Sequence, residues 1–174
     1  MAERARFRTT AGDMLRSLVV VLAVVAVILI LNARDESPTV RSTGYTGALR
    51  VARDAASYDV LGPVGLSSGW RANSARAPRE DVGVTLHIGF VTPEGEYAGL
   101  EQGGGASKRF VDRFVDGSRA DGDVTIGGRT WQRREGGDPE PRGLVARIGS
   151  STVVVAGTAG WDELEELAGS LQAG

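Results

Sequence analysis

The feature that most constrains this chain is an unbroken run of fourteen apolar residues, from Leu18 to Leu31. At 1.5 Å per residue, a helix of that length spans about 21 Å, less than the roughly 30 Å hydrocarbon core of a bilayer. A wider window over residues 14–33 supplies the missing length, and only Arg16, Ser17 and Asn32 interrupt it, all near its ends. The run therefore predicts one transmembrane helix over residues 14–33. Its middle carries no charge, so we expect an anchor without an ion path.

The flanks of this run predict its orientation. Four arginines and two acidic residues precede it, whereas one arginine and two acidic residues follow it directly. Because positively charged flanks stay in the cytoplasm, we expect a cytoplasmic basic head over residues 1–13 and an exported C-terminal part. A cleaved signal peptide is the alternative, but cleavage after Ala33 would require a small residue at the position of Leu31. The pattern favours an uncleaved signal anchor in the cell membrane.

Composition limits what the exported part can bind. The whole chain has a net charge of −2, and since the residues before the run carry +2, the remainder carries −4. This balance argues against nucleic-acid binding and against tight docking on anionic lipid. The chain has no Cys, so its stability depends on a hydrophobic core rather than on disulfides. We expect a polar linker over residues 34–47 and one extracytoplasmic domain over residues 48–174.

Strand patterns dominate the exported part. In the segment 84–90, Val84, Leu86, Ile88 and Phe90 alternate with more polar residues, which is typical of a strand with one buried face. Turn residues follow it, so the segment 97–102 can return as an antiparallel partner. The pairs Gly127-Gly128 and Gly149-Ser150 predict two further hairpins.

Three consecutive valines, Val153 to Val155, predict a strand that is buried on both faces. Layers must then cover the sheet on both sides, and helical patterns over residues 48–57, 107–116 and 159–171 can supply them. The predicted fold class is α+β: a transmembrane helix followed by a mainly antiparallel sheet of about five to seven strands with helices packed on it.

Motifs for catalysis are weak. Gly65 to Gly69 matches the G-x-S-x-G pattern of serine hydrolases, but that pattern requires a strand before Ser67 and a helix after it. Pro63 precedes the motif and a strand pattern follows, so we interpret it as a turn. His87 is the only histidine and there is no Cys, so no metal-ligand set can be assembled from these residue types. We expect no catalytic residue, no metal and no cofactor.

Aromatic and basic residues indicate the best candidate binding surface. Trp70 can anchor a ligand, and Arg71 and Arg76 can meet an acidic envelope polymer. The alternatives are that the tryptophan packs in the core and that the arginines form a solvated strand edge. His87 lies on the polar face of its strand, where cross-strand hydrogen bonding is expected, and Tyr97 begins the partner strand. These five residues are the predicted ligand or partner site.

The function class that fits best is a binding or accessory module for an unknown envelope partner or ligand. The reasons are a membrane anchor and the lack of a catalytic constellation. Two alternatives stay open. One is a carrier of lipid or of a small hydrophobic ligand, and the other is a hydrolase that uses Ser67 and His87.

The chain also resembles a known family, the actinobacterial membrane proteins grouped as domain of unknown function 4245. The resemblance extends over nearly the whole chain, and its most specific block is His87 to Pro93 with Gly95 and Tyr97-Ala98. It is also carried by Gly12-Asp13-Met14, Ser17-Leu18, Leu66, Gly69-Trp70-Arg71, Ser74-Ala75-Arg76, Trp131, Gly157-Thr158-Ala159, Glu163-Leu164, Leu167-Ala168 and Ser170-Leu171. The family implies one membrane pass and a compact exported domain, and it transfers no catalytic residue. The order of elements is also similar to that of small Mog1/PsbP-like domains, which is an analogy of fold only.

Overall fold

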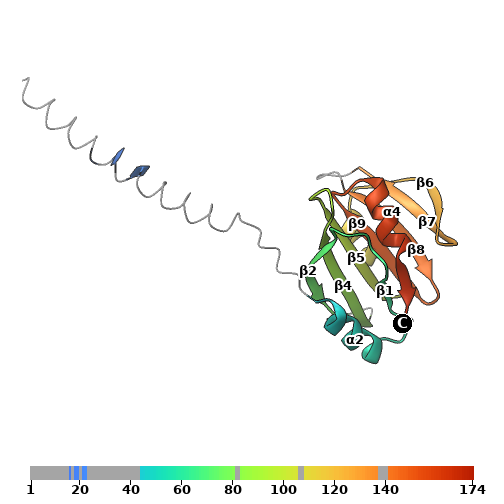
Figure 1. The fold of residues 1–174 in the computed structure, drawn as a ribbon. Coiled ribbons are helices and arrows are strands. Elements are labelled where there is room, and N and C mark those ends of the chain that lie inside the picture. Colours follow the sequence, from blue (N-terminus) through green and yellow to red (C-terminus); the bar gives the residue numbers. More distant parts are fainter. Residues whose placement is uncertain are drawn as a thin grey trace, which may run out of the picture. The chain divides into compact units, whose positions relative to one another are not determined.

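The computed structural model describes residues 44–80, 83–105, 108–136 and 141–174, together with Arg16, Leu18, Val19, Val21 and Leu22 (Figure 1). The chain divides into two compact units, residues 1–39 and 40–174. In the first unit, the five described residues are helical. The remainder of the predicted anchor over residues 14–33 lies outside the described residues, as do the predicted head and most of the linker. Within the described ranges, no helix has the length and apolar character that a membrane crossing requires.

The second unit is built on an antiparallel sheet of eight strands. Seven of them lie in the order β2-β4-β5-β9-β8-β7-β6. The eighth, the two-residue strand β3, pairs with β4, as β2 does. Their bounds are Arg71–Arg76 (β2), Arg79–Glu80 (β3), Gly83–Val91 (β4), Tyr97–Gly104 (β5), Arg119–Ile126 (β6), Arg129–Glu135 (β7), Arg142–Ile148 (β8) and Ser151–Gly157 (β9). Every pairing in the sheet is antiparallel, as the sequence predicts. With the short β3 the sheet has eight strands, whereas the sequence predicts five to seven.

The predicted hairpins are present. Gly127 and Gly128 join β6 to β7 with φ values of 56° and 76°. Positive φ at both central residues is the requirement of a two-residue turn whose twist matches that of the strands, and glycine adopts it without a steric penalty. The turn between β4 and β5 is also where the sequence predicts it, so the register of this hairpin pairs Val91 with Tyr97. A separate two-stranded sheet pairs β1 (Leu61–Pro63) with β10 (Leu171–Ala173).

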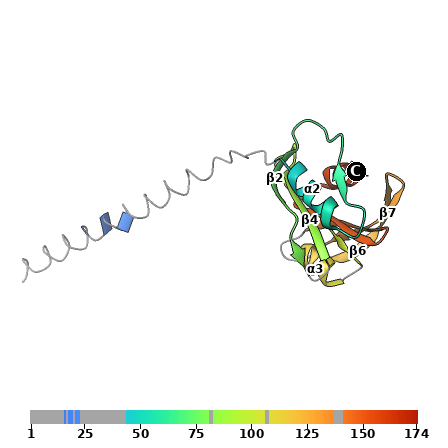
Figure 2. The same ribbon diagram turned by 90° about the horizontal axis from the view of Figure 1, so that it is seen from below.

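Helices cover both faces of the sheet. The helices α2 (Thr46–Ala55) and α4 (Trp161–Gly169) pack on one face, and α3 (Lys108–Val115) packs on the other. In Figure 2, α2 and α3 lie on either side of β4. Two separate cores result, and the valine run of β9 contributes to both of them: Val153 and Val155 lie in the larger core, and Val154 lies beneath α3. The prediction of a strand buried on both faces is confirmed.

Candidate functional site

The face of the sheet that carries α3 is not covered evenly. The helix α3 contacts β8 and β9, and its core consists of Phe110, Val115, Val154 and Ala156. Over β2, β4 and β5, the same face carries polar side chains and glycines instead. We call this region the β2–β4–β5 patch. It consists of Asn73, Ser74, Arg76, His87, Tyr97 and Glu101.

Strand register explains why these residues meet. In β4, Leu86 and Ile88 point into the larger core, so His87 between them points to the opposite face. The pairing of β4 with β5 places Glu101 directly across from His87, and the pairing with β2 places Arg76 across from it on the other side. Residues directly opposite in an antiparallel pair have their side chains in contact distance on one face. The site is therefore a row across three adjacent strands.

A chain of hydrogen bonds runs along this row. His87 Nδ1 bonds to Glu101 Oε1, and His87 Nε2 lies 2.9 Å from Ser74 Oγ. His87 and Glu101 are each 7% exposed, whereas Ser74 on the edge strand is half-buried. A buried imidazole with a carboxylate on one nitrogen and a hydroxyl on the other has both of its polar atoms satisfied. The expected cross-strand hydrogen bonding of His87 is confirmed.

Burial and charge act against each other at Glu101. Burial raises the pKa of Glu101 above its usual value, although the hydrogen bond and charge of His87 and the charge of Arg76 lower it. Burial also raises the pKa of Tyr97, with a further contribution from the negative charge of Glu101. Arg76 opposes the shift at both residues, and its guanidinium is exposed on β2. It is thus the cation that balances the patch.

Glycines form the floor of the patch. A Cβ at Gly89 would overlap Ser74 Oγ, and it would lie 2.8 Å from Asn73 Oδ1 and 3.1 Å from Tyr97 Cε2. A Cβ at Gly99 would lie 2.9 Å from the hydroxyl oxygen of Tyr97. The side chain of Tyr97 therefore lies directly over the backbone of β4 and β5, and only glycine leaves room for it.

The structure brings together three of the five predicted site residues: Arg76, His87 and Tyr97. Arg71 pairs with Val91 at the other end of β2, two positions along β4 from Gly89. Trp70 lies elsewhere. Its ring packs edge-on against Phe90, with centroids 5.7 Å apart, among residues of the larger core. Trp70 therefore packs with the larger core, the alternative that the sequence left open, because strand alternation sends Phe90 to the face opposite His87.

Sequence reasoning missed Ser74 and Glu101. Glu101 carries a signal in the sequence, since a hairpin centred on the turn after Val91 places it opposite His87. Ser74 carries no comparable signal, because β2 contains a register shift between Ala72 and Ser74. The shift is a β-bulge, and it decides which face Ser74 occupies.

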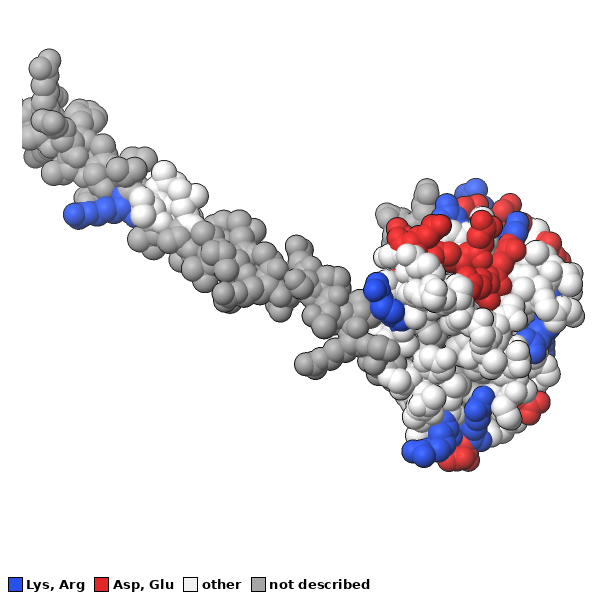
Figure 3. Space-filling model, viewed as in Figure 1, with Lys and Arg blue, Asp and Glu red and all other residues white. Residues whose placement is uncertain are grey.

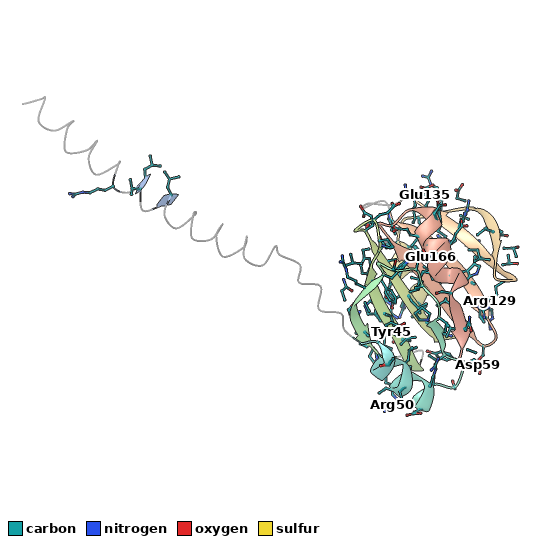
Figure 4. All side chains as sticks on the ribbon, viewed as in Figure 1. Tyr45, Arg50, Asp59, Arg129, Glu135 and Glu166 are labelled. Atoms are coloured by element: carbon teal, nitrogen blue, oxygen red, sulfur yellow. The ribbon has the colours of Figure 1, made fainter. Side chains whose placement is uncertain are left out.

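The G-x-S-x-G motif is a loop with a turn, as predicted, and it is tied to α4. The backbone N–H of Ser67 donates to Glu166 Oε1 over 2.9 Å, and Figure 4 labels Glu166 on α4. Partial burial raises the pKa of Glu166, but hydrogen bonds from the hydroxyl and backbone of Ser67 outweigh this and lower it below the usual value. Ser67 is therefore not placed to act with His87, as the hydrolase alternative requires. The serine that contacts His87 is Ser74.

An aromatic cavity of about 330 Å³ lies beside the loop of Ser67. Its lining comprises Gly44, Tyr45, Gly65, Leu66, Ser67, Trp70, Ala72 and Phe90. Tyr45, labelled in Figure 4, packs edge-on against Phe90 with ring centroids 5.8 Å apart. The other tryptophans do not contribute to it: Trp131 is fully buried in the larger core, and Trp161 lies under Arg133, whose guanidinium carbon is 5.0 Å from the ring centroid.

The surface over α4 is acidic. Acidic side chains gather over α4 (Figure 3), whose sequence contains Asp162, Glu163, Glu165 and Glu166. Within the part of the chain that the structure describes, no group of three or more His, Cys, Asp or Glu residues is arranged to hold a metal ion.

Comparison with known proteins gives a family and no activity. No curated protein matches the chain. The model of one protein family, described as "Protein of unknown function (DUF4245)", matches residues 6–171. The match covers the apolar run, the strands of the β2–β4–β5 patch and α4. The chain therefore belongs to the DUF4245 family.

Proposed function

We propose that this chain is a single-pass membrane protein whose extracytoplasmic domain is a binding or accessory module for a cell-envelope partner. The predicted helix over residues 14–33, which contains the apolar run, is the anchor. The basic head over residues 1–13 remains in the cytoplasm, and the linker over residues 34–47 leads to the domain. The charge bias around the run supports this orientation.

One observation supports the β2–β4–β5 patch as the binding surface. Two buried polar residues, His87 on β4 and Glu101 on β5, continue the row that begins on the edge strand β2, where Arg71, Asn73 and Arg76 are exposed. Burying a histidine and a carboxyl group costs more free energy than burying apolar residues of similar size, so packing alone does not favour them. The exposed guanidinium groups favour a partner with an anionic group, a carboxylate or a phosphate.

The membrane placement is tested with topology reporters. Fusions of an enzyme that is active only outside the cytoplasm, placed after residue 13 and after residue 174, should give no activity at the first site and full activity at the second. Activity at the first site only would overturn the orientation. A mature N-terminus beyond residue 33 would overturn the anchor.

The binding surface is tested by photo-crosslinking in intact cells. A photoreactive amino acid in place of Tyr97, which is 37% exposed, should give one reproducible adduct with an envelope component. The same substitution at Val51, which is 53% exposed on α2, is the matched control and should not give that adduct. Arg76→Glu should abolish the adduct, and Arg50→Glu on α2 should leave it. Equal adducts at both positions, or none at position 97, would contradict the proposed surface.

A second candidate function is transport of a small hydrophobic ligand or lipid. The observation in its favour is the aromatic cavity around Trp70, whose volume is within the range of small-molecule sites. Native mass spectrometry of the full chain should then show a bound ligand, and Leu66→Trp, which fills the cavity, should remove it. An unliganded wild-type mass, or a ligand that Leu66→Trp retains, would exclude this candidate.

A further inference from the structure

We infer that Ser74, His87 and Glu101 form a nucleophilic serine triad that cleaves carboxylic esters. This activity goes beyond partner binding and does not depend on it. The three side chains come from three neighbouring strands, β2, β4 and β5, and they lie in the order nucleophile, base and acid along one row of the sheet.

The contacts match the requirements of such a triad. A serine is activated when an adjacent base accepts its proton and a third group orients the base. With the imidazole proton on Nδ1, His87 donates to Glu101 Oε1, and its Nε2 is free to accept from the Ser74 hydroxyl at 2.9 Å. This distance is within the reach of proton transfer between a nucleophile and a general base.

Exposure differs among the three residues in the way the chemistry needs. His87 and Glu101 are 7% exposed, so water does not compete for their contact. Ser74 is half-buried on an edge strand, so an ester can approach its hydroxyl from solvent. The side-chain carbonyl oxygen of Asn73 lies 3.2 Å from Ser74 Oγ and is a second acceptor for the single proton of this hydroxyl.

The steps balance without a cofactor. Ser74 Oγ attacks the carbonyl carbon of the ester, and its proton passes to His87 Nε2. The tetrahedral intermediate collapses, the bond from carbon to the alcohol oxygen breaks, and the leaving alkoxide takes the proton from His87. Water then attacks the acyl-serine with His87 as base, which releases the carboxylic acid and restores the Ser74 hydroxyl.

The same chemistry allows a direct test with a fluorophosphonate probe on the full-length chain in detergent. Attack by Ser74 forms an oxygen–phosphorus bond, expels fluoride and moves one proton to His87. We expect one label per chain, and peptide mapping should place it on Ser74. Ser74→Ala should abolish labelling. His87→Gln should slow it by at least about 100-fold, the contribution of a general base.

Controls separate catalysis from folding and from chance reactivity. Ser68→Ala removes an exposed serine of the neighbouring loop and should label at the wild-type rate. Since His87→Gln changes a buried site, Glu101→Gln is a second variant that keeps an acceptor for Nδ1, and it should slow labelling at least about tenfold. Circular dichroism establishes that each variant is folded. A wild-type rate no higher than that of Ser74→Ala, a label on Ser67, or full labelling of folded His87→Gln would overturn the inference.

Discussion

His87 Nε2 lies 2.9 Å from Ser74 Oγ, and a β-bulge in the edge strand makes this contact possible. Ala72 pairs with Phe90 on the face of the larger core. In a regular strand, Ser74 would share that face with Ala72, because side chains alternate with a period of two. The register shift pairs Ser74 with Gly89 instead, which moves its hydroxyl to the face of His87.

Gly89→Ala should disrupt the patch without changing any of its polar residues. The new Cβ would overlap Ser74 Oγ and crowd Tyr97, so Ser74 must move away from His87. We expect fluorophosphonate labelling to fall to the level of Ser74→Ala. The free energy of unfolding in urea should fall by about 1–3 kcal/mol, the usual cost of overpacking.

The matched control for this substitution is Gly47→Ala in α2, where an added Cβ meets nothing within 4 Å. It should keep wild-type labelling and raise the free energy of unfolding by up to about 1 kcal/mol, because alanine favours a helix more than glycine does. Unchanged labelling in Gly89→Ala would show that the observed position of Ser74 is not required.

Glu166→Gln should remove a contribution to stability that depends on pH. Because the pKa of Glu166 is lowered in the folded protein, its carboxylate stabilises the fold above the usual pKa of a glutamate, and this contribution is lost as pH falls through the lowered pKa. At pH 7 the variant should be less stable by up to about 1 kcal/mol, since Glu166 is partly exposed and its contacts are screened.

Urea denaturation of wild type and Glu166→Gln over pH 3–7 measures this effect. The difference in the free energy of unfolding should vanish at the acidic end. A difference that does not vary with pH would mean that the hydrogen bonds of Ser67 do not depend on the charge of Glu166.

Val154→Ala and Val155→Ala should loosen different layers of the domain. Both side chains are fully buried, so each variant should lose about 1–3 kcal/mol of stability. Val154 packs with Phe110 and Val115, so its truncation should speed amide exchange selectively in α3. Val155→Ala should instead speed exchange in elements of the larger core, α4 among them. Hydrogen-exchange mass spectrometry distinguishes the two, and identical exchange patterns would contradict the two-core arrangement.

Local patterns in the sequence predict much of this fold. The alternation of Leu86, Ile88 and Phe90 fixes the buried face of β4, and the valines of β9 require layers on both sides. These signals are reliable because they depend on a strand's own period or on a turn of two to four residues. The pairing of β1 with β10 carries no such signal, since it joins Leu61 to Ala173 across most of the domain.

The candidate site is predictable only in part, for the same reason. His87 and Tyr97 stand out by residue type, and the hairpin register of β4 and β5 leads to Glu101. Ser74 becomes its partner through a bulge and through the pairing of β2 with β4, which sequence spacing does not determine. The serine that the sequence motif singles out, Ser67, binds α4 instead.

The state of the His87 imidazole can be read directly, because it is the only histidine in the chain and its NMR signals need no further assignment. A long-range proton–nitrogen correlation spectrum of the neutral ring should show one tautomer, with the proton on Nδ1 facing Glu101 and a bare Nε2 facing Ser74. The Nδ1 proton should be shifted far downfield and should disappear in Glu101→Ala. A rapidly exchanging mixture of tautomers, or a proton held on Nε2, would contradict the hydrogen-bonded row on which both the patch and the triad depend.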